Sequence, residues 1–314
     1  MDSEFKYQIS YGKTLVPVYR VYATPLSGIT PIRESAFKGK SNNLVAFEVD
    51  VEVLGNNFLP AYIEGDNSQV VATDSMKNFI IRQGLAYTGS TLEGYLDFLG
   101  QQFLTTYSQM EGLRLTGREL PFVPVQAPAG AAGSFEESPV LYSRSHDDYT
   151  VVTMDYSRQG DRAVLSGHRC GRINMELLKV TGSSFTSFVR DGYTTLPERG
   201  DRPLFIHLSI FWQYADTADL LRPDHSSYVA GEQVRDLAQV VFHEFVSESI
   251  QHLVHEIGQR LLERFPQVAE VSFEAKNQTP DPIATSLTDS KIKVYSAPFP
   301  AFGLIKLTVN RNKL

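Results

Sequence analysis

The stretch LEGYLDFLGQQFLTTY, residues 92–107, has a counterpart in IQHLVHEIGQRLLERF, residues 250–265. The two stretches lie 158 positions apart, close to half of the 314 residues, and they align without a gap. Gly100 falls on Gly258, and apolar residues fall on apolar residues along the register. Such self-similarity indicates that the chain contains two copies of one structural unit.

Both stretches are predicted to form amphipathic helices, because their apolar residues recur at spacings of three and four positions. In the first copy these residues are Leu92, Tyr95, Leu96, Leu99, Phe103, Leu104 and Tyr107. In the second copy they are Ile250, Leu253, Val254, Ile257, Leu261, Leu262 and Phe265. A shorter helix is expected to begin at Asp74 or Ser75, which both suit the N-cap position, and to include Met76 and Phe79.

Alternation of apolar and polar residues predicts strands with one buried face. The clearest example is residues 47–53, where Glu48, Asp50 and Glu52 would form a solvated face. Further strands are predicted at residues 14–23, 149–156, 173–180, 204–212 and 302–309. Each copy then runs strand, strand, helix, helix, strand, strand, which predicts an α+β fold with a large antiparallel sheet.

Helices on a single face would leave the other face and the edges of such a sheet uncovered. We therefore expect a homo-oligomer in which sheets join edge to edge into a barrel, with sites at subunit junctions. The sequence PVQAPAGAAGS, residues 124–134, has the composition of a loop, so we place the boundary between the copies there. The predicted domains are residues 1–134 and 135–314.

The overall composition limits the classes of protein. Hydrophobic residues make up 42% and charged residues 21%, and no apolar run is long enough to cross a bilayer, so we expect a soluble globular protein. The net charge of -7 and the pI near 5.5 disfavour a phosphate backbone as partner. We therefore expect neither a nucleic acid nor a membrane as a partner.

Several separated motifs resemble those of the urate oxidase family, and they occur in that family's order. They are Tyr11-Gly-Lys13, VVATDSMKNF at 70–79, FTSFVRDGYTTLPE at 185–198, Ser249-Ile-Gln251 and Asn277. The resemblance implies two tandem T-fold repeats of order ββααββ, with helices on one face, assembled into a barrel-like homotetramer. It also implies oxidation of urate by dioxygen and water to 5-hydroxyisourate and hydrogen peroxide, with no metal and no organic cofactor.

Urate is a flat, anionic purine, so its pocket needs an aromatic plate, a cation and an amide group. The resemblance implies that Phe185 stacks on the ring, that Arg202 pairs with a carbonyl and a ring nitrogen, and that Gln251 bonds to the opposite edge. Ile250 would form part of the wall. From the residues alone, Phe185 could equally be a core aromatic, and Arg202 could form a surface pair with Asp201.

The resemblance assigns proton transfer to Lys13 and Thr73. The lysine amine would take a proton from the threonine hydroxyl, which serves the substrate or peroxide. The backbone amides of Thr73 and Asp74 would bind the five-membered ring of the substrate. From the residues alone, Lys13 would be a solvated lysine, and Thr73 or Asp74 a helix cap.

By the same resemblance, Asn277 would hold dioxygen, peroxide or water above the ring plane. The sequence NQTP, residues 277–280, also has the composition of a turn. Many family members carry a histidine two residues after this asparagine, whereas this chain has Thr279. A hydroxyl group can pass a proton but cannot take up charge as imidazole does, so Thr279 is a catalytic candidate by position alone.

A metal site has to be considered at His243, His252 and His255, which lie in or near helices of the second copy. They do not spell HExxH, because Ser247 stands where the second histidine would be, so we expect no metal site. Two other functions stay open. One is a T-fold enzyme that processes pterins or related purines, and the other is a non-catalytic oligomeric protein that binds a purine.

The location is expected to be the bacterial cytoplasm. No basic region precedes an apolar stretch at the start of the sequence, so secretion is not expected. The single cysteine, Cys170, fits a reducing compartment. Asn312-Lys313-Leu314 resembles the peroxisomal address of eukaryotic family members, but asparagine replaces the small residue that the receptor reads.

Overall fold

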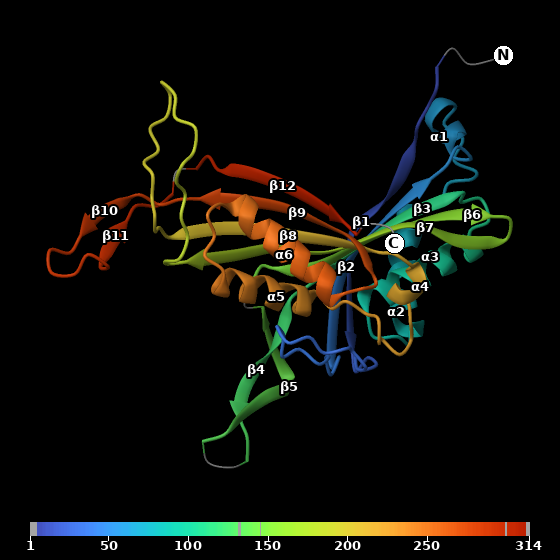
Figure 1. Ribbon diagram of the computed structural model, residues 1–314. Coiled ribbons are helices and arrows are strands. Elements are labelled where there is room, and N and C mark those ends of the chain that lie inside the picture. Colours follow the sequence, from blue (N-terminus) through green and yellow to red (C-terminus); the bar gives the residue numbers. More distant parts are fainter. Residues whose placement is uncertain (1–4, 131–132, 145, 299, 312–314) are drawn as a thin grey trace. The chain divides into compact units, whose positions relative to one another are not determined.

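The structure of the protein, a computed structural model, describes residues 5–130, 133–144, 146–298 and 300–311 (Figure 1). Asn312-Lys313-Leu314 lies outside the described residues. The chain forms two compact units, which are described separately. Unit 1 contains the described residues of Met1–Thr30, Lys38–Cys170 and Asp216–Tyr228. Unit 2 contains those of Pro31–Phe37, Gly171–Ala215 and Val229–Leu314.

Unit 1 packs helices against antiparallel strands. The strands are β1 (Ser10–Val21), β2 (Leu44–Leu54), β3 (Gly112–Glu119), β6 (Tyr149–Gln159) and the first part of β7 (Arg162–Lys179). The helices are α1 (Leu59–Ile63), α2 (Thr73–Ala86), α3 (Leu92–Thr106) and α4 (Thr217–Leu220). Strands β4 (Phe122–Pro128) and β5 (Phe135–Arg144) form a separate hairpin that projects from the unit in Figure 1.

Unit 2 repeats this arrangement. Its strands are the second part of β7, β8 (Leu204–Tyr214), β9 (Val268–Gln278) and β12 (Gly303–Asn310). Its helices are α5 (Gly231–Glu244) and α6 (Ile250–Arg264). Strands β10 (Pro282–Thr285) and β11 (Lys293–Tyr295) form a second projecting hairpin (Figure 1). The observed order of main elements in each unit is therefore two strands, two helices and two strands, with a hairpin inserted between the last two.

The hydrogen-bonded order of the large sheet is β1-β2-β3-β6-β7-β8-β9-β12. The chain passes from one unit to the other at Cys170 and Gly171, inside β7. Pairings β1·β2, β2·β3, β3·β6, β8·β9 and β9·β12 are antiparallel. The sheet of one chain thus has two ends, β1 and β12, and it is not closed into a barrel. The predicted α+β class with a large antiparallel sheet is confirmed.

Burial along β2 follows the predicted alternation. Val49, Val51 and Val53 are at most 1% exposed, because they face the helices of unit 1. Burial of each such side chain contributes roughly 1.5–3 kcal/mol. On the opposite face, Asp50 is half-buried and accepts a hydrogen bond from Arg118 Nη2 at 2.7 Å. The predicted acidic face is therefore not simply solvated, since at least Asp50 is paired with a charge on β3.

The two long helices are confirmed, but the predicted cap of the shorter helix is wrong. Helix α2 begins at Thr73, and the N-cap residue is Ala72, whose side chain accepts no hydrogen bond. Asp74 lies in the first turn of the helix and not at its cap. The backbone amides of this turn therefore receive no side-chain acceptor from the N-cap position.

The predicted strands are also confirmed, although several were missed. Residues 14–23, 47–53, 149–156, 173–180, 204–212 and 302–309 correspond to β1, β2, β6, β7, β8 and β12. Strands β3, β4, β5, β9, β10 and β11 were not predicted. The segment 124–134 overlaps the β4–β5 hairpin of unit 1. A repeat boundary after Ser134 stays a prediction, and the two compact units divide at Cys170 and Gly171, inside β7.

An arginine near the end of β6, and another directly after β12, each bind the carboxyl end of a helix. Arg158 of β6 donates to the carbonyl groups of Leu104, Tyr107 and Met110, where α3 ends. Arg311, directly after β12, donates to the carbonyl groups of Leu262, Phe265 and Val268, where α6 ends. The two sets of carbonyl groups are related by the offset of 158 found in the sequence.

The first strand of each unit supplies a similar cation. Arg20 of β1 donates to the carbonyl groups of Gly84 and Tyr87, at the end of α2. Lys179 of β7 donates to the carbonyl groups of Phe242 at 2.8 Å and Phe245 at 2.9 Å, at the end of α5. Cations at these positions satisfy carbonyl groups that have no partner within the helix. Each unit therefore uses a basic residue from its first strand and one from its last strand to fix its two helices on the sheet.

Arg158→Ala should reduce the free energy of unfolding by about 1–3 kcal/mol, because the carbonyl groups at the end of α3 lose a charged donor. Arg311→Ala should have a similar effect on α6. Urea-induced unfolding measures both. Arg114→Ala is the control, since its ion pair with Asp155 is half-exposed and should contribute less than about 1 kcal/mol. Losses no larger than that of Arg114→Ala would contradict the role of the two caps.

Candidate active site

Three segments of unit 2 meet beside the amino end of α6. The backbone N–H of Ser184 donates to the Ser247 carbonyl at 2.8 Å on one side of the segment 183–185. On the other side, Phe185 and Arg199 exchange backbone hydrogen bonds of 2.9 and 3.0 Å, and Arg202 N–H donates to the Ser183 carbonyl at 2.8 Å. This local pairing places the side chains of Phe185 and Arg202 together.

Arg202 is a buried cation, with 6% of its surface exposed. Its Cζ atom lies 5.3 Å from the centroid of the Phe185 ring. Nη1 donates to Thr279 Oγ1 at 3.1 Å, whereas the buried Nε has no hydrogen-bond partner within the described part of the chain. Burial, and next the charge of Arg199, lower the pKa of Arg202. A buried guanidinium group whose Nε has no partner among the described residues is suited to bind an anion.

Asp201 does not neutralise this guanidinium. Its carboxylate accepts hydrogen bonds of 2.7 Å from Thr181 Oγ1 and from the backbone N–H of Gly182. The alternative reading of Asp201 and Arg202 as a surface pair is therefore wrong. Asp201 instead fastens the segment that leads into Ser183 and Phe185.

Ile250 and Gln251 are the first two residues of α6. Ser249 caps this helix, since its Oγ accepts from His252 N–H at 3.1 Å. Ile250 is buried, while the Gln251 side chain is exposed and can reach a ligand. The bond between Ser184 and Ser247 holds the start of α6 next to Phe185.

Asn277 lies in strand β9 and not in a turn, so the turn alternative is wrong. It pairs in register with Ile206 of β8 and with Gly303 of β12. Thr279 follows just after the strand and is held by the bond from Arg202. Unit 2 thus brings Phe185, Arg202 and Thr279 into direct contact, with Asn277 two residues before Thr279.

The other predicted residues gather in unit 1, where β1 packs beside the amino end of α2. Tyr11 OH accepts a hydrogen bond from Val71 N–H at 3.0 Å, which ties the approach to α2 onto β1. The pKa of Asp74 is lowered first by its hydrogen bond and charge interaction with Lys77, and to a smaller extent by the charge of Lys13. Lys13 and the start of α2 are therefore neighbours.

Among the residues that the structure describes, Lys13 and Thr73 share no direct hydrogen bond. Lys13 lies on β1 just before a register shift in the pairing with β2. Gly12 beside it is required, because a Cβ atom there would lie 1.8 Å from the Val51 carbonyl oxygen. Tyr11 and Gly12, which position this region, could have been found from the motif Tyr11-Gly-Lys13.

Unit 1 contains a counterpart of the cluster in unit 2, and this counterpart is filled by protein. Leu26 pairs with Lys40 as Phe185 pairs with Arg199. Glu93, which aligns with Gln251, is only 1% exposed and accepts a hydrogen bond from Tyr228 OH at 3.0 Å. Leu26 thus stands at the position of Phe185. The side chain of Glu93, at the position of Gln251, is already bonded to the phenol of Tyr228.

The histidines considered as metal ligands have other surroundings. The imidazole of His252 makes an edge contact with the Phe245 ring, with 4.5 Å between the ring centroids. In the described ranges, no group of three or more His, Cys, Asp and Glu side chains is placed to hold a metal ion.

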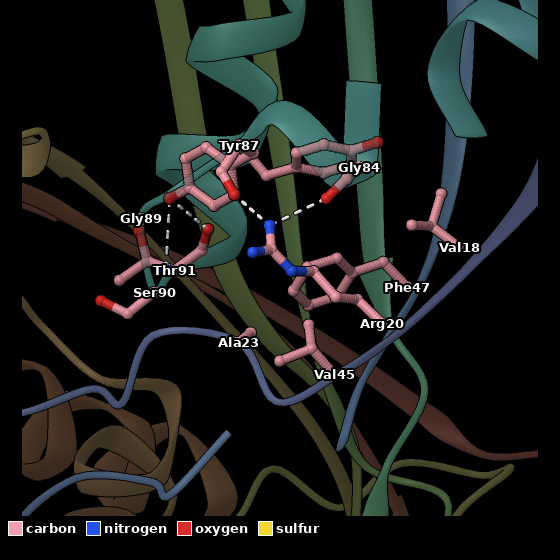
Figure 2. Close-up of a pocket in the computed structure, with 11 residues that line it drawn as sticks. Val18, Arg20, Ala23, Val45, Phe47, Gly84, Tyr87, Gly89, Ser90 and Thr91 are labelled. Carbon is pink, nitrogen blue, oxygen red and sulfur yellow. Dashed lines mark hydrogen bonds between the residues drawn. The ribbon is translucent and has the colours of Figure 1, made fainter. Parts of the chain in front are cut away.

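A hollow with an empty volume of about 340 Å³ lies in unit 1 around Arg20 (Figure 2). Val18, Val45 and Phe47 form part of its apolar wall. Figure 2 shows the Arg20 guanidinium group directed to the carbonyl groups of Gly84 and Tyr87, so it serves the helix cap described above. The hollow contains none of the predicted site residues.

Comparison with known proteins supports the reading of the motifs. The uricase family model matches residues 168–306. A uricase of Haloferax volcanii is 45% identical over 306 residues, which cover 98% of this chain and 99% of the relative. A uric acid degradation bifunctional protein of Bacillus subtilis is 44% identical over 310 residues. That match covers 99% of this chain but 62% of the relative, so the chain spans less than two thirds of the bifunctional protein.

Solved structures agree with this result. A crystal structure of urate oxidase from Bacillus sp. TB-90 superposes with a TM-score of 0.93 at 42% sequence identity. The superposition covers 97% of this chain and 100% of that chain. Within the described residues, none of the helices is both long and apolar enough to span a bilayer.

Asp201 should make part of the stability depend on pH. The Thr181 hydrogen bond, as the largest cause, lowers the pKa of this carboxyl group. A carboxyl group with a lowered folded-state pKa stabilises the fold above its unfolded pKa, and this stabilisation is lost as pH falls through the folded pKa. Between about pH 5 and about pH 2, Asp201→Asn should therefore lose less stability than the wild type. Urea midpoints at both pH values measure the loss, and equal losses would contradict this role.

Proposed function

Because the chain belongs to the uricase family, we propose that it oxidises urate with dioxygen and water to 5-hydroxyisourate and hydrogen peroxide. The observation that carries this proposal is the buried Arg202, whose Nε is without a partner among the described residues and whose guanidinium lies beside Phe185. An anionic, flat substrate would supply both the missing charge and a ring to stack.

In the proposed complex, Phe185 stacks on the purine and Arg202 pairs with a carbonyl oxygen and a ring nitrogen. Gln251 binds the opposite edge through its amide, and Ile250 forms the adjoining wall. The exposed Gln251 and the buried Ile250 at the start of α6 support this division. The bond from Arg202 to Thr279 fixes the direction of the guanidinium group toward the ligand.

Thr73 and Asp74 bind the five-membered ring through backbone amides. This assignment is supported by the N-cap of α2, since Ala72 cannot satisfy the amides of the first turn. Lys13 takes a proton from the Thr73 hydroxyl, which accepts one from the substrate or delivers one to peroxide. Lys13 is near enough to the start of α2 for its charge to affect Asp74.

The urate anion loses two electrons to dioxygen, which becomes hydrogen peroxide, and water supplies the hydroxyl group of 5-hydroxyisourate. Asn277 holds dioxygen, peroxide or water above the ring plane, and Thr279 passes a proton. Binding, orientation and proton transfer are then the contributions of the protein. No metal and no organic cofactor takes part in this proposal.

The two units are proposed to be tandem T-fold repeats, assembled into a barrel-like homotetramer in the bacterial cytoplasm. The repeated basic caps and the open edges β1 and β12 support this arrangement. In the tetramer, the Lys13 and Thr73 cluster of one subunit would complete the Phe185 and Arg202 cluster of another. Active sites would then lie at subunit interfaces.

Metal-stripped protein should consume urate and oxygen in equal amounts and produce an equal amount of hydrogen peroxide. An oxygen electrode and the ultraviolet absorbance of urate follow the reaction. Turnover that appears only after zinc is added would favour the pterin or purine T-fold enzyme. Urate binding without turnover would favour the non-catalytic purine-binding protein.

Lys13→Met should lower kcat by about 10²–10⁴-fold and change urate affinity far less, because general base catalysis contributes in that range. Arg202→Ala should weaken binding and turnover together, since it removes a contact to the substrate. Steady-state kinetics and anaerobic urate titration measure both effects. Lys306→Met, which removes an exposed lysine paired with Glu274, is the control. An unchanged kcat in Lys13→Met would contradict the proposed relay.

A further inference from the structure

The side chain of Asn277 occupies space that only a glycine on the neighbouring strand leaves open. Gly303 of β12 pairs directly with Asn277 of β9. A Cβ atom at Gly303 would lie 2.4 Å from Asn277 Oδ1, far closer than van der Waals contact. The next atom of another residue, Ile305 Cδ1, would be 3.8 Å away, at ordinary contact distance. The conflict is therefore specific to the carboxamide of Asn277.

The backbone of Gly303 does not itself require glycine. Its φ angle is outside the positive range, so an alanine can adopt the same conformation. Glycine at residue 303 is thus explained by the space that Asn277 Oδ1 occupies and not by the backbone conformation. Since the conflicting atom is the far end of a side chain, an added methyl group would turn that side chain and leave the strand pairing in place.

Few other contacts can determine the direction of the Asn277 carboxamide. In an antiparallel sheet, opposing residues direct their side chains to the same face, so Ile206 and Gly303 flank Asn277 on that face. Ile206 is fully buried and offers no polar group. Within the described ranges, the Asn277 carboxamide makes no hydrogen bond to protein, so packing against Gly303 determines its direction.

We propose that Gly303 is a positioning residue, which sets the direction of the Asn277 carboxamide by leaving room for Oδ1 on β12. This inference rests on the proposed function, because it concerns the group that holds dioxygen, peroxide or water above the substrate. With Oδ1 against Gly303, the Nδ2 amide is the atom left to donate a hydrogen bond to a ligand. A methyl group at residue 303 would turn the amide and weaken that bond.

Kinetics of single and double variants test the proposal. Removing one such donor costs about 10²–10³-fold in kcat, and this is the effect expected of Asn277→Ala. Gly303→Ala should lower kcat at least about tenfold and change KM for urate by less than about threefold, as expected for an interaction made after substrate binding. Gly130→Ala is the matched control, because a Cβ atom there would meet nothing within 4 Å and the residue lies in none of the family motifs.

The double variant distinguishes positioning from general damage to the strand. If Gly303 acts only through the carboxamide, Gly303→Ala should have no further effect on kcat in the Asn277→Ala background. Losses that multiply, or an unchanged kcat in Gly303→Ala, would overturn the proposal. The thermal midpoint of each variant shows whether the fold is intact.

A crystal structure of Gly303→Ala gives a readout that does not need activity. The carboxamide of Asn277 should be turned away from β12 while the pairing of β9 with β12 is kept. An unmoved carboxamide beside a shifted strand would overturn the inference, even in an active enzyme. Wild-type protein that fails to oxidise urate would instead contradict the proposed function, whatever this structure shows.

Discussion

A buried guanidinium group without a carboxylate partner is the feature on which the rest of the site depends. Arg202 is 6% exposed, and its Nε has no acceptor among the described residues. Burial of an unpaired charge costs free energy, so the fold has to hold the group in place by other contacts. Phe185, Thr279 and the backbone pairing with Ser183 provide them. An anionic ligand would lower this cost, so binding of the ligand would also stabilise the site.

The two units share a framework but differ in the residues that the site needs. Both units fix their helices with basic residues from the first and last strands, so the fold is secured in the same way twice. Unit 2 places the Phe185 ring beside the buried guanidinium group of Arg202. In unit 1 the corresponding space is filled, with Glu93 bonded to Tyr228 and Leu26 in place of the plate. Unit 1 instead presents Lys13 and the uncapped start of α2.

The main elements could be predicted from sequence because they depend on periodic burial. The stripe that begins at Leu92 and its copy both form helices, and burial alternates in β2 over residues 47–53. Strands β3 and β9 were missed although Leu113 and Leu115 in β3, and Val271 and Phe273 in β9, alternate with polar residues. The N-cap of α2 was misplaced because Asp74 is a good cap by type, whereas the backbone becomes helical one residue earlier.

The site residues were named from motifs, and their contacts could not be predicted. Arg202 follows Asp201 in sequence, yet Asp201 accepts hydrogen bonds from Thr181 and Gly182, whereas Arg202 donates to Thr279. Asn277 lies in a sequence typical of turns but belongs to β9, where pairing with two strands outweighs local preference. The need for Gly303 is visible only when β12 is placed beside β9.

The most direct test of this account is a crystal structure of the protein with urate bound in the absence of oxygen. The urate ring should stack on Phe185, with a carbonyl oxygen and a ring nitrogen within hydrogen-bond distance of the Arg202 guanidinium. Urate bound elsewhere, with the guanidinium of Arg202 still without an anionic partner, would contradict it.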